Sequence, residues 1–185
     1  CFRKVLSTNN IAKFLANHGS PEGTVIISEI QTKARGRSGT KWESPEGGIW
    51  MSIILRPNLE PAKASLITLA AGVAIAKTMR NRGIDAKIKW PNDVLIKGKK
   101  VSGVLTEANI TLNKLDYVIV GVGIDTNLNI EDLSEDLKAG ATTLHDEMKL
   151  EKVDENEALI DLLEEEITTY LVQLSKTDID ERNHD

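Results

Sequence analysis

Cysteine, histidine and long apolar runs are scarce in this chain of 185 residues. Its single cysteine excludes an internal disulfide, and its three histidines show no spacing typical of a zinc site. No run of about 18 apolar residues is present, so we expect no membrane-spanning helix. The sequence shows no charged-then-apolar leader, and together with the single cysteine this favours a cytoplasmic protein.

Several common enzyme motifs are missing as well. No G-x-x-x-x-G-K-[ST] motif occurs, which excludes a P-loop, and no G-x-S-x-G motif indicates an esterase. The stretch Gly121-Val122-Gly123 lacks the third glycine and the following helix of a dinucleotide-binding turn. These absences direct attention to other stretches of the chain.

What is present is an ordinary globular composition, 41% hydrophobic and 28% charged, at a length that fits one domain. The net charge of −5 is unevenly distributed. Residues 1–130 carry 18 basic and 10 acidic side chains, whereas residues 131–185 carry 5 basic and 18 acidic ones. We therefore expect an anionic partner for the first part, and we interpret the acidic part as a helix that faces water.

The apolar pattern predicts strands in meander order with helices inserted between groups of strands. Helices are expected over residues 7–19, 60–83, 131–140, 142–148 and 154–175, and strands over 24–30 and 48–55. Roughly three or four further antiparallel strands are expected between Ala86 and Ile124. In the first helix, helical spacing places Ile11, Phe14, Leu15 and His18 on one face.

This order of elements does not alternate strand with helix, so the predicted fold class is α+β, with a mixed or antiparallel β-sheet flanked by helices. One domain is expected over residues 1–175, followed by a polar, frayed tail over residues 176–185.

A basic loop runs from Gln31 to Trp42 and contains four cations and no acid. Arg35 and Arg37 offer paired donors for phosphate or carboxylate, and Trp42 has a face on which a base could stack. Gly36 and Gly39 permit close backbone approach or positive φ. The alternatives are a solvated surface loop or an RNA contact, and composition alone does not decide between them.

A second stretch, "KIKWPNDV", contains a turn at Pro91-Asn92-Asp93. Lys89 and Trp90 precede this turn on a strand that is expected to be buried. A carboxylate and an amide at a strand corner suit Mg²⁺ or a ribose hydroxyl. The alternative is a turn whose side chains cap its own backbone.

A third stretch, "KGKKVSGVLTE", is a lysine-rich hairpin. Regular alternation would place Val101, Gly103 and Leu105 on one face of the strand. Lys100 would then lie on the opposite face. Gly103 then leaves a gap in the sheet that could admit a ligand, whereas Lys97 and Lys99 are interpreted as solubilising residues of the hairpin tip.

These stretches together resemble one family. "STNN", "EIQTKARGRSGTKWESPEGGIWMSIIL", "KWPNDV", "GKKVSGVLTE" and "VGVGIDTN" are similar to the ordered motifs of the biotin protein ligases, over about residues 7–127. The resemblance implies a catalytic domain of the class II aminoacyl-tRNA synthetase-like fold. It also implies an enzyme that activates biotin with ATP and Mg²⁺ as biotinyl-5'-AMP, and then transfers biotin to a lysine of a biotin carboxyl carrier protein.

The resemblance also implies roles for the matching residues. The implied biotin-binding residues are Ser7, Thr8, Asn9, Gln31, Arg35, Lys100, Gly103, Gly121 and Gly123. The implied ATP-binding residues are Arg35, Gly36, Arg37, Trp42, Lys89, Asn92, Asp93, Lys100 and Asp125. Lys100, Arg35 and Arg37 are the implied catalytic residues, and Asp93 is the implied metal ligand.

The chain departs from the family pattern at a few positions. Ala34 stands where glycine is common, Ser38 and Thr40 stand where arginine is frequent, and Asp125 stands where the family often has asparagine. The small C-terminal β-domain and the N-terminal DNA-binding domain of some relatives are not expected in this chain. A homodimer is expected, with no nucleic-acid or membrane partner. The alternatives are a lipoate or octanoate ligase, which usually carries "RRxSGGGxVxHD", a catalytically impaired relative, and an RNA-binding protein.

Overall fold

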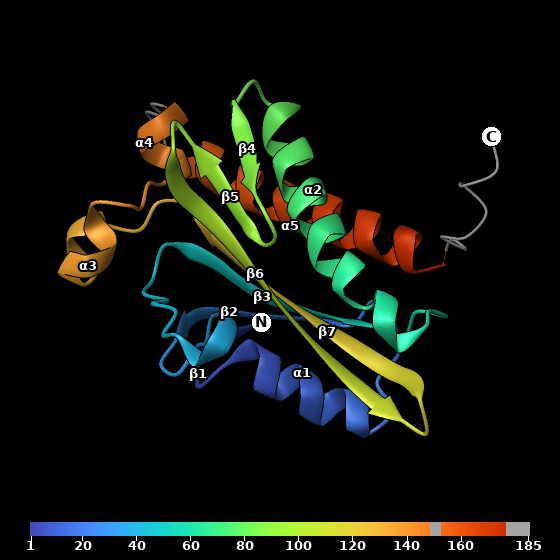
Figure 1. Ribbon diagram of the computed structural model, residues 1–185. Coiled ribbons are helices and arrows are strands. Elements are labelled where there is room, and N and C mark those ends of the chain that lie inside the picture. Colours follow the sequence, from blue (N-terminus) through green and yellow to red (C-terminus); the bar gives the residue numbers. More distant parts are fainter. Residues whose placement is uncertain (149–152, 177–185) are drawn as a thin grey trace, which may run out of the picture.

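The computed structural model describes residues 1–148 and 153–176, whose strands form a seven-stranded sheet (Figure 1). The strands are β1 (Phe2–Val5), β2 (Val25–Gln31), β3 (Gly48–Leu55), β4 (Ala86–Lys89), β5 (Asp93–Ile96), β6 (Lys99–Thr111) and β7 (Lys114–Asp125). Their order across the sheet is β1-β2-β3-β7-β6-β5-β4. β1 pairs parallel with β2 and the other neighbours pair antiparallel, so the expected α+β fold with a mixed sheet is confirmed.

The helices also follow the prediction. They are α1 (Thr8–Asn17), α2 (Ser65–Arg80), α3 (Glu135–Lys138), α4 (Leu144–Met148) and α5 (Val153–Lys176), with short 3₁₀ turns η1 (Arg37–Gly39), η2 (Pro61–Lys63) and η3 (Ile130–Asp132). The predicted polar tail, residues 176–185, lies outside the described residues except for Lys176.

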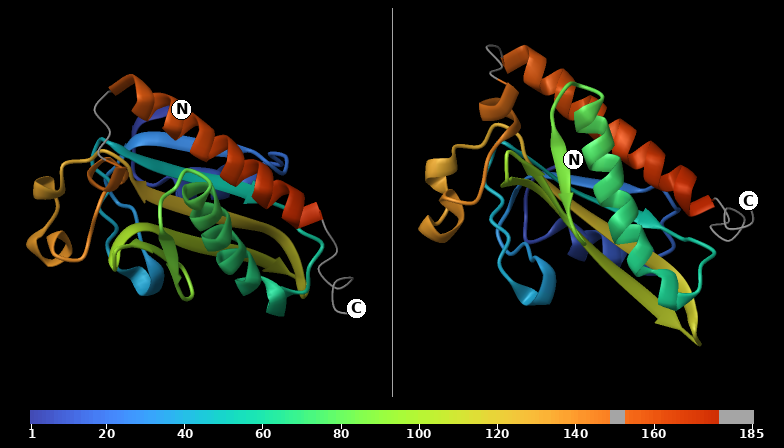
Figure 2. Two further views of the ribbon diagram at one scale, coloured as in Figure 1. Left: turned by 90° about the horizontal axis from the view of Figure 1, so that it is seen from above. Right: turned by 45° about the horizontal axis from the view of Figure 1, so that its top comes forward.

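The two faces of the sheet have different partners. α2 and α5 lie side by side over one face, and α1 lies on the opposite face (Figures 1 and 2). Side chains alternate along a strand, so β3 and β7 each send every second residue into the main core beneath α2 and α5. These core residues are Ile49, Met51, Ile53, Leu55, Val118, Val120, Val122 and Ile124. The same alternation leaves Ser52, Gly121 and Gly123 on the α1 face.

The segment Pro61–Arg80 is long and apolar enough to cross a membrane by length and composition alone. In the fold, 44% of its apolar window is buried, and α2 packs on α5 and on β4 to β7. Buried core helices have the same composition as membrane spans, so we interpret α2 as a core helix.

Burial differs from the sequence pattern at two places, and only the second is a burial that the sequence analysis predicted. Phe14 is 60% exposed, and the buried face of α1 is formed by small and polar residues, Thr8, Asn9, Ala12 and Ala16, that fit closely against the sheet. Lys89 and Trp90 were predicted to be buried but are exposed, Trp90 by 76%, and they lie at and just beyond the end of the edge strand β4. The parallel strand β1 was not predicted.

A third correction concerns β6. Val101 packs in the main core with Val104, not on the face of Gly103. The pairing of β5 with β6 shifts register between Val94 and Leu95, so that Val94 faces Ser102 while Leu95 faces Lys100. The extra residue of this β-bulge is Val101, and it reverses the alternation. As a result, Lys100 and Gly103 lie on the same side.

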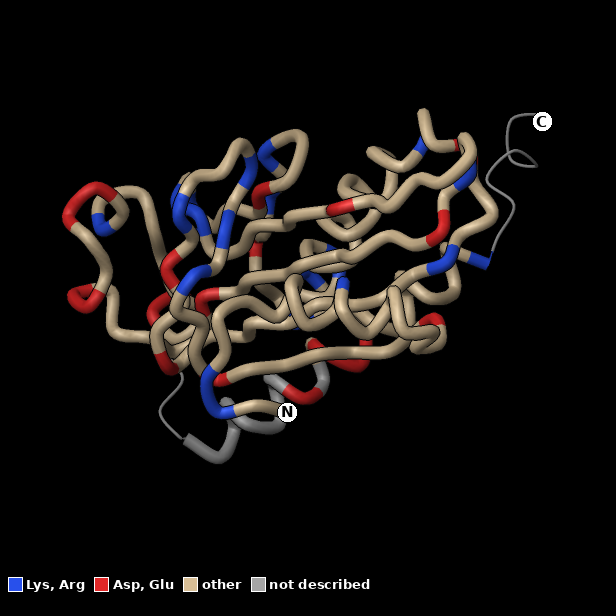
Figure 3. The backbone as a smooth tube through the Cα atoms, turned by 90° about the horizontal axis from the view of Figure 1, so that it is seen from below, with Lys and Arg blue, Asp and Glu red and all other residues tan. Residues whose placement is uncertain are grey.

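Charge is also segregated in the fold. Figure 3 shows the acidic segment around α3 at one end of the molecule, near basic stretches of the strands and loops. The acidic residues of this segment are Glu131, Asp132, Glu135 and Asp136, and Lys138 binds two of them.

Candidate active site

A cavity of about 500 Å³ opens on the sheet face that carries Gly121 and Gly123. It is lined by every residue predicted for the site except Lys89. Three segments form its walls: the basic loop (residues 31–42), the turn at Asn92-Asp93, and residues 133–141. Residues that are distant in the sequence therefore meet in one hollow.

One end of the cavity is a chain of polar side chains. The Gln31 carboxamide oxygen accepts hydrogen bonds from the backbone N–H (2.8 Å) and the hydroxyl (3.1 Å) of Thr8. Ser52 Oγ lies 2.7 Å from Thr8 Oγ1 and 2.5 Å from Asn9 Oδ1. Gln31 in turn donates to Ser44 Oγ at 3.1 Å. These contacts fix the donors and acceptors that a polar ligand ring would meet.

The other end of the cavity is centred on Lys100. Its ammonium lies 2.7 Å from Asp93 Oδ1 and 4.8 Å from the centre of the Trp42 ring. Asn92 donates to the same Asp93 oxygen at 3.1 Å and accepts from Arg37 at 3.3 Å. The predicted turn residues therefore contact both the lysine and the basic loop.

Trp42 lies on a gap in the sheet made by two paired glycines, Gly103 and Gly123. A Cβ atom added to either glycine would come within 2.8 Å of the Trp42 ring. The Trp42 indole N–H is buried and has no hydrogen-bond partner among the described residues. The glycines thus admit the flat Trp42 side chain against the sheet, and the prediction that the gap at Gly103 admits a ligand stays a prediction.

The basic loop itself is a small hairpin. The backbone N–H of Gly36 donates to the Thr40 carbonyl at 2.7 Å, and the N–H of Trp42 donates to the Ala34 carbonyl at 3.1 Å. Gly39 has a φ of 77°, which glycine adopts readily, so the predicted freedom is used at this position. The loop is closed at its base and presents Arg35 and Arg37 to the cavity wall.

Asp125, at the end of β7, is 7% exposed. No described residue donates a hydrogen bond to its carboxylate. Burial raises the pKa of Asp125 to about 7, and the positive charge of Lys100 offsets part of that rise. Since Lys100 already binds Asp93, one cation faces two carboxylates.

The segment after β7 was not predicted to belong to the site. The backbone N–H of Lys100 donates to the Gly140 carbonyl at 2.8 Å, and its carbonyl accepts from Thr142 at 2.9 Å. Glu43 accepts a hydrogen bond from the backbone of Ser134 at 2.9 Å and binds Lys41 at 2.8 Å. These contacts tie residues 133–141 to both the lysine hairpin and the basic loop.

A family model for the biotin/lipoate A/B protein ligase family matches residues 2–125. The chain belongs to this ligase family. The bifunctional ligase/repressor BirA of Bacillus spizizenii is 44% identical over 142 residues, which is 76% of this chain and 44% of that protein. The biotin–[acetyl-CoA-carboxylase] ligase of Mycobacterium tuberculosis is 34% identical over 131 residues, 68% of this chain and 46% of that protein. The chain thus spans less than half the length of these curated relatives.

Solved structures of ligases agree with this membership. The biotin protein ligase of Aquifex aeolicus in complex with biotin and ATP is similar with a TM-score of 0.74 and 30% identity. The match covers 96% of this chain and 72% of that one. The Leishmania major biotin protein ligase in complex with biotinyl-5-AMP, at 21% identity, shares the fold with a TM-score of 0.71.

The predicted site residues divide into two groups by their position in the structure. Lys89 is exposed and does not line the cavity, and the structure places the other predicted residues around it. The described residues contain no group of three or more His, Cys, Asp or Glu side chains that could hold a metal ion by themselves. Asp93 and Asp125 are two carboxylates on the cavity wall, and Asp93 is already bound to Lys100.

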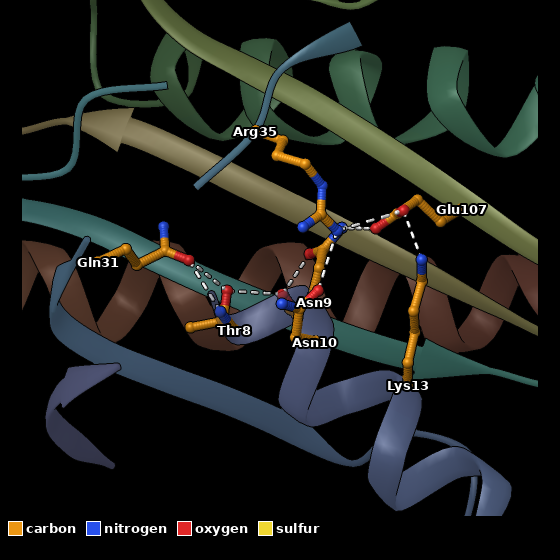
Figure 4. Close-up of polar contacts among 8 residues, drawn as sticks. Thr8, Asn9, Asn10, Lys13, Gln31, Arg35 and Glu107 are labelled. Carbon is orange, nitrogen blue, oxygen red and sulfur yellow. Dashed lines mark hydrogen bonds and ion pairs between the residues drawn. The ribbon is translucent and has the colours of Figure 1, made fainter. Parts of the chain in front are cut away.

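Sequence reasoning missed Glu43, which lines the cavity, and Ser52 and Glu107, which contact residues that line it. Ser52 falls in an apolar strand, and its alternation with Met51 and Ile53 was the available signal. Glu107 sits on β6 and receives hydrogen bonds from Asn9 Nδ2 at 2.7 Å and Lys13 Nζ at 2.5 Å, with Arg35 Nη2 at 3.6 Å (Figure 4). No local pattern joins a glutamate to partners so far along the chain.

Proposed function

We propose that this chain is the catalytic part of an ATP-dependent biotin–protein ligase. In the first reaction, a biotin carboxylate oxygen attacks the α-phosphorus of ATP, and the bond to pyrophosphate breaks. In the second, the amine of a carrier lysine attacks the carbonyl carbon of biotinyl-5'-AMP, an amide forms, and AMP leaves. The amine loses its proton in that step.

One observation carries the proposal: a single cavity joins the polar chain from Gln31 to Asn9 with the cationic end at Lys100. The polar end suits an uncharged ring that has donors and acceptors, as biotin has. The cationic end suits the carboxylate and the phosphate that must react. Both substrates occur together in the Aquifex aeolicus structure, which supports the same arrangement for this chain.

Charge explains why the reaction needs Lys100, Arg35 and Arg37. A carboxylate and a phosphate at about 4 Å, in an effective dielectric of about 20, repel each other by roughly 4 kcal/mol. Cations fixed beside the reacting atoms remove this repulsion and stabilise the charge that develops at phosphorus. The basic loop would also exclude water from the adenylate, which hydrolyses when it is exposed.

Mg²⁺ fits the site only as a partner of the nucleotide. Asp93 supplies one carboxylate, and Mg²⁺ in such sites takes most of its other ligands from phosphates and water. When bound, it would neutralise phosphate charge. Asp93, bound to Lys100 and Asn92, keeps that lysine beside the reacting groups.

The same proposal extends to partners and location. The carrier would be a biotin carboxyl carrier protein of a carboxylase, as the name of the Mycobacterium tuberculosis relative indicates for that enzyme. β6 runs to Thr111 although its pairing with β5 ends at Gly103, and this stretch of edge supports pairing with a second copy in a homodimer. A cytoplasmic location fits the single cysteine.

Biotin-dependent release of pyrophosphate from Mg·ATP, without carrier protein, tests the proposal. Lipoate and octanoate are assayed in parallel, because the family model covers both biotin and lipoate ligases and octanoate is a related acid. Release with biotin alone is the expected result. Release with another acid would keep the chemistry and overturn the substrate, and no release from folded protein would overturn the proposed activity.

Lys100→Ala should lower this release by about a hundredfold or more, since a fixed charge beside the reacting phosphate is lost. Lys99→Ala is the matched control, because it removes the same charge from an exposed neighbouring position. Equal losses in both variants would show that general basicity, not Lys100, supports the reaction.

A further inference from the structure

Glu107 stands just outside the cavity and contacts residues that line it. Its side chain is 21% exposed and does not line the cavity, whereas Asn9 and Arg35 do. Figure 4 shows Arg35 and Lys13 pointing toward Glu107 from different sides, with Asn9 beside them. These groups come from the basic loop, α1 and β6, so one carboxylate joins three separate elements.

The first consequence concerns Arg35. Its Nη2 nitrogen donates to Asn10 at 2.9 Å and lies 3.6 Å from Glu107. Its remaining guanidinium N–H groups have no partner among the described residues. Asn10 and Glu107 together therefore hold one side of the guanidinium, Asn10 by a hydrogen bond and Glu107 by its charge, and leave the other side to bind a carboxylate or phosphate through paired hydrogen bonds.

The second consequence concerns Asn9. Its amide nitrogen donates to Glu107 at 2.7 Å, and its amide oxygen lies 2.5 Å from Ser52 Oγ. Because a carboxylate only accepts hydrogen bonds, Glu107 fixes which end of the Asn9 amide faces it. The Asn9 oxygen then lies against Gly121, where any Cβ atom would overlap it.

The surroundings of Glu107 favour its ionised form. Burial disfavours its ionised form, but the hydrogen bonds from Lys13 and Asn9 and the nearby cations outweigh burial, so the pKa of Glu107 is lowered. The other acid beside the basic loop, Glu43, binds Lys41 at 2.8 Å. Arg35 and Lys41 thus have separate anionic partners.

We propose that Glu107 is a positioning residue of the adenylation reaction. It fixes Asn9 in the cavity floor and Arg35 in the basic loop relative to each other. The ring of biotin and its carboxylate are then bound at the same time, each at its own end of the cavity. The inference rests on the proposed function. The competing explanation is a purely structural tie between Glu107 and Lys13 that anchors α1.

A double-mutant cycle separates the two explanations. Glu107→Gln keeps the shape and removes the charge, and it should lower biotin-dependent pyrophosphate release by about tenfold, as expected for one charge-assisted contact. In an Arg35→Gln background the same change should cost clearly less, because the part of the effect that Glu107 exerts through Arg35 is already lost and only the contact with Asn9 remains. Losses that simply multiply, or no loss in Glu107→Gln alone, would overturn the inference.

Two further variants make the cycle specific. Lys13→Met removes the other cation and should leave release within about twofold of the parent, because Lys13, unlike Arg35, does not line the cavity. Glu107→Asp keeps the charge and should retain more activity than Glu107→Gln. It replaces Glu107→Gln in the cycle if that variant does not fold. A loss in Lys13→Met as large as in Glu107→Gln would favour the structural tie.

A second measurement needs no catalysis. In ligand-free protein, Glu107→Gln should speed tryptic cleavage after Arg35 and leave cleavage after Lys41 unchanged. Glu43→Gln is the matched control with the opposite pattern. Unchanged cleavage after Arg35 would overturn the inference. Absence of pyrophosphate release in the parent protein would instead count against the proposed function, and the cleavage pattern would still decide whether Glu107 holds Arg35.

Discussion

Asp125 makes the stability of this protein depend on pH in a direction that can be calculated. Burial raises the pKa of its carboxyl from 3.8 to about 7, a rise of about 3 units. At roughly 1.4 kcal/mol per unit, the ionised carboxylate costs the folded state on the order of 4 kcal/mol. The group is 7% exposed, so screening by water removes little of this cost. That is a large share of the roughly 5–15 kcal/mol that stabilises a typical domain.

The sign follows from proton binding. Between pH 4 and pH 7 the folded protein holds a proton on Asp125 that the unfolded chain has already lost, so stability falls as the pH rises through this range. Below the range both states are protonated, and above it both are ionised and the full cost is present. Asp125→Asn removes the titration and keeps the size of the side chain.

The assay is urea unfolding of the parent and Asp125→Asn at a series of pH values. The variant should match the parent at about pH 4 and be more stable by several kcal/mol at about pH 8, as linkage requires. Asp85→Asn is the control, because its carboxylate is 80% exposed and loses little hydration on folding. A difference between parent and Asp125→Asn that does not change with pH would refute the reasoning.

Three further predictions concern the cavity. Gly121→Ala should weaken biotin binding by roughly ten- to a hundredfold in calorimetry, because the added Cβ atom overlaps Asn9. ATP binding should be less affected, and equal losses of biotin and ATP affinity would contradict this prediction. Gly123→Ala should displace Trp42 and weaken nucleotide binding by about tenfold, because the added Cβ atom would lie 2.8 Å from the Trp42 ring. An unchanged affinity for the nucleotide would show that the Trp42 ring does not contribute to its site. Arg35→Gly should open the basic loop and release the adenylate, which would be measured as biotin attached to lysines of bystander proteins. Arg3→Gly is the control, because Arg3 is exposed.

The fold was largely predictable because its helices and strands have strong periodicity. α2 and α5 are long, and β3 and β7 are apolar over most of their length. The predictions failed where a neighbour decides the outcome. β1 is short and gains its structure by pairing with β2, and α1 buries its small residues because the sheet lies close to it.

The bulge at Val101 shows the limit of periodicity for the site. Regular alternation places Lys100 and Gly103 on opposite faces, and only the register of the neighbouring strand reveals that they share one. Glu107 shows the same limit over a longer range, since its partners Asn9 and Lys13 lie 98 and 94 residues away. Motifs identified the residues of the cavity, whereas the contacts that orient them depend on the whole sheet.

The placement of the tryptophans gives the protein its own optical reporter. Trp50 is fully buried and donates a hydrogen bond to the Pro45 carbonyl at 2.8 Å, and Trp90 is 76% exposed outside the cavity. Neither residue lines the cavity, although the Trp50 ring meets the Trp42 ring edge-on, with 6.4 Å between the ring centroids. Trp42 lies in the cavity, under the Lys100 ammonium and against paired glycines. A change in tryptophan emission on adding biotin or ATP would therefore report on Trp42 and its edge contact with Trp50, so occupancy can be followed in real time without any label.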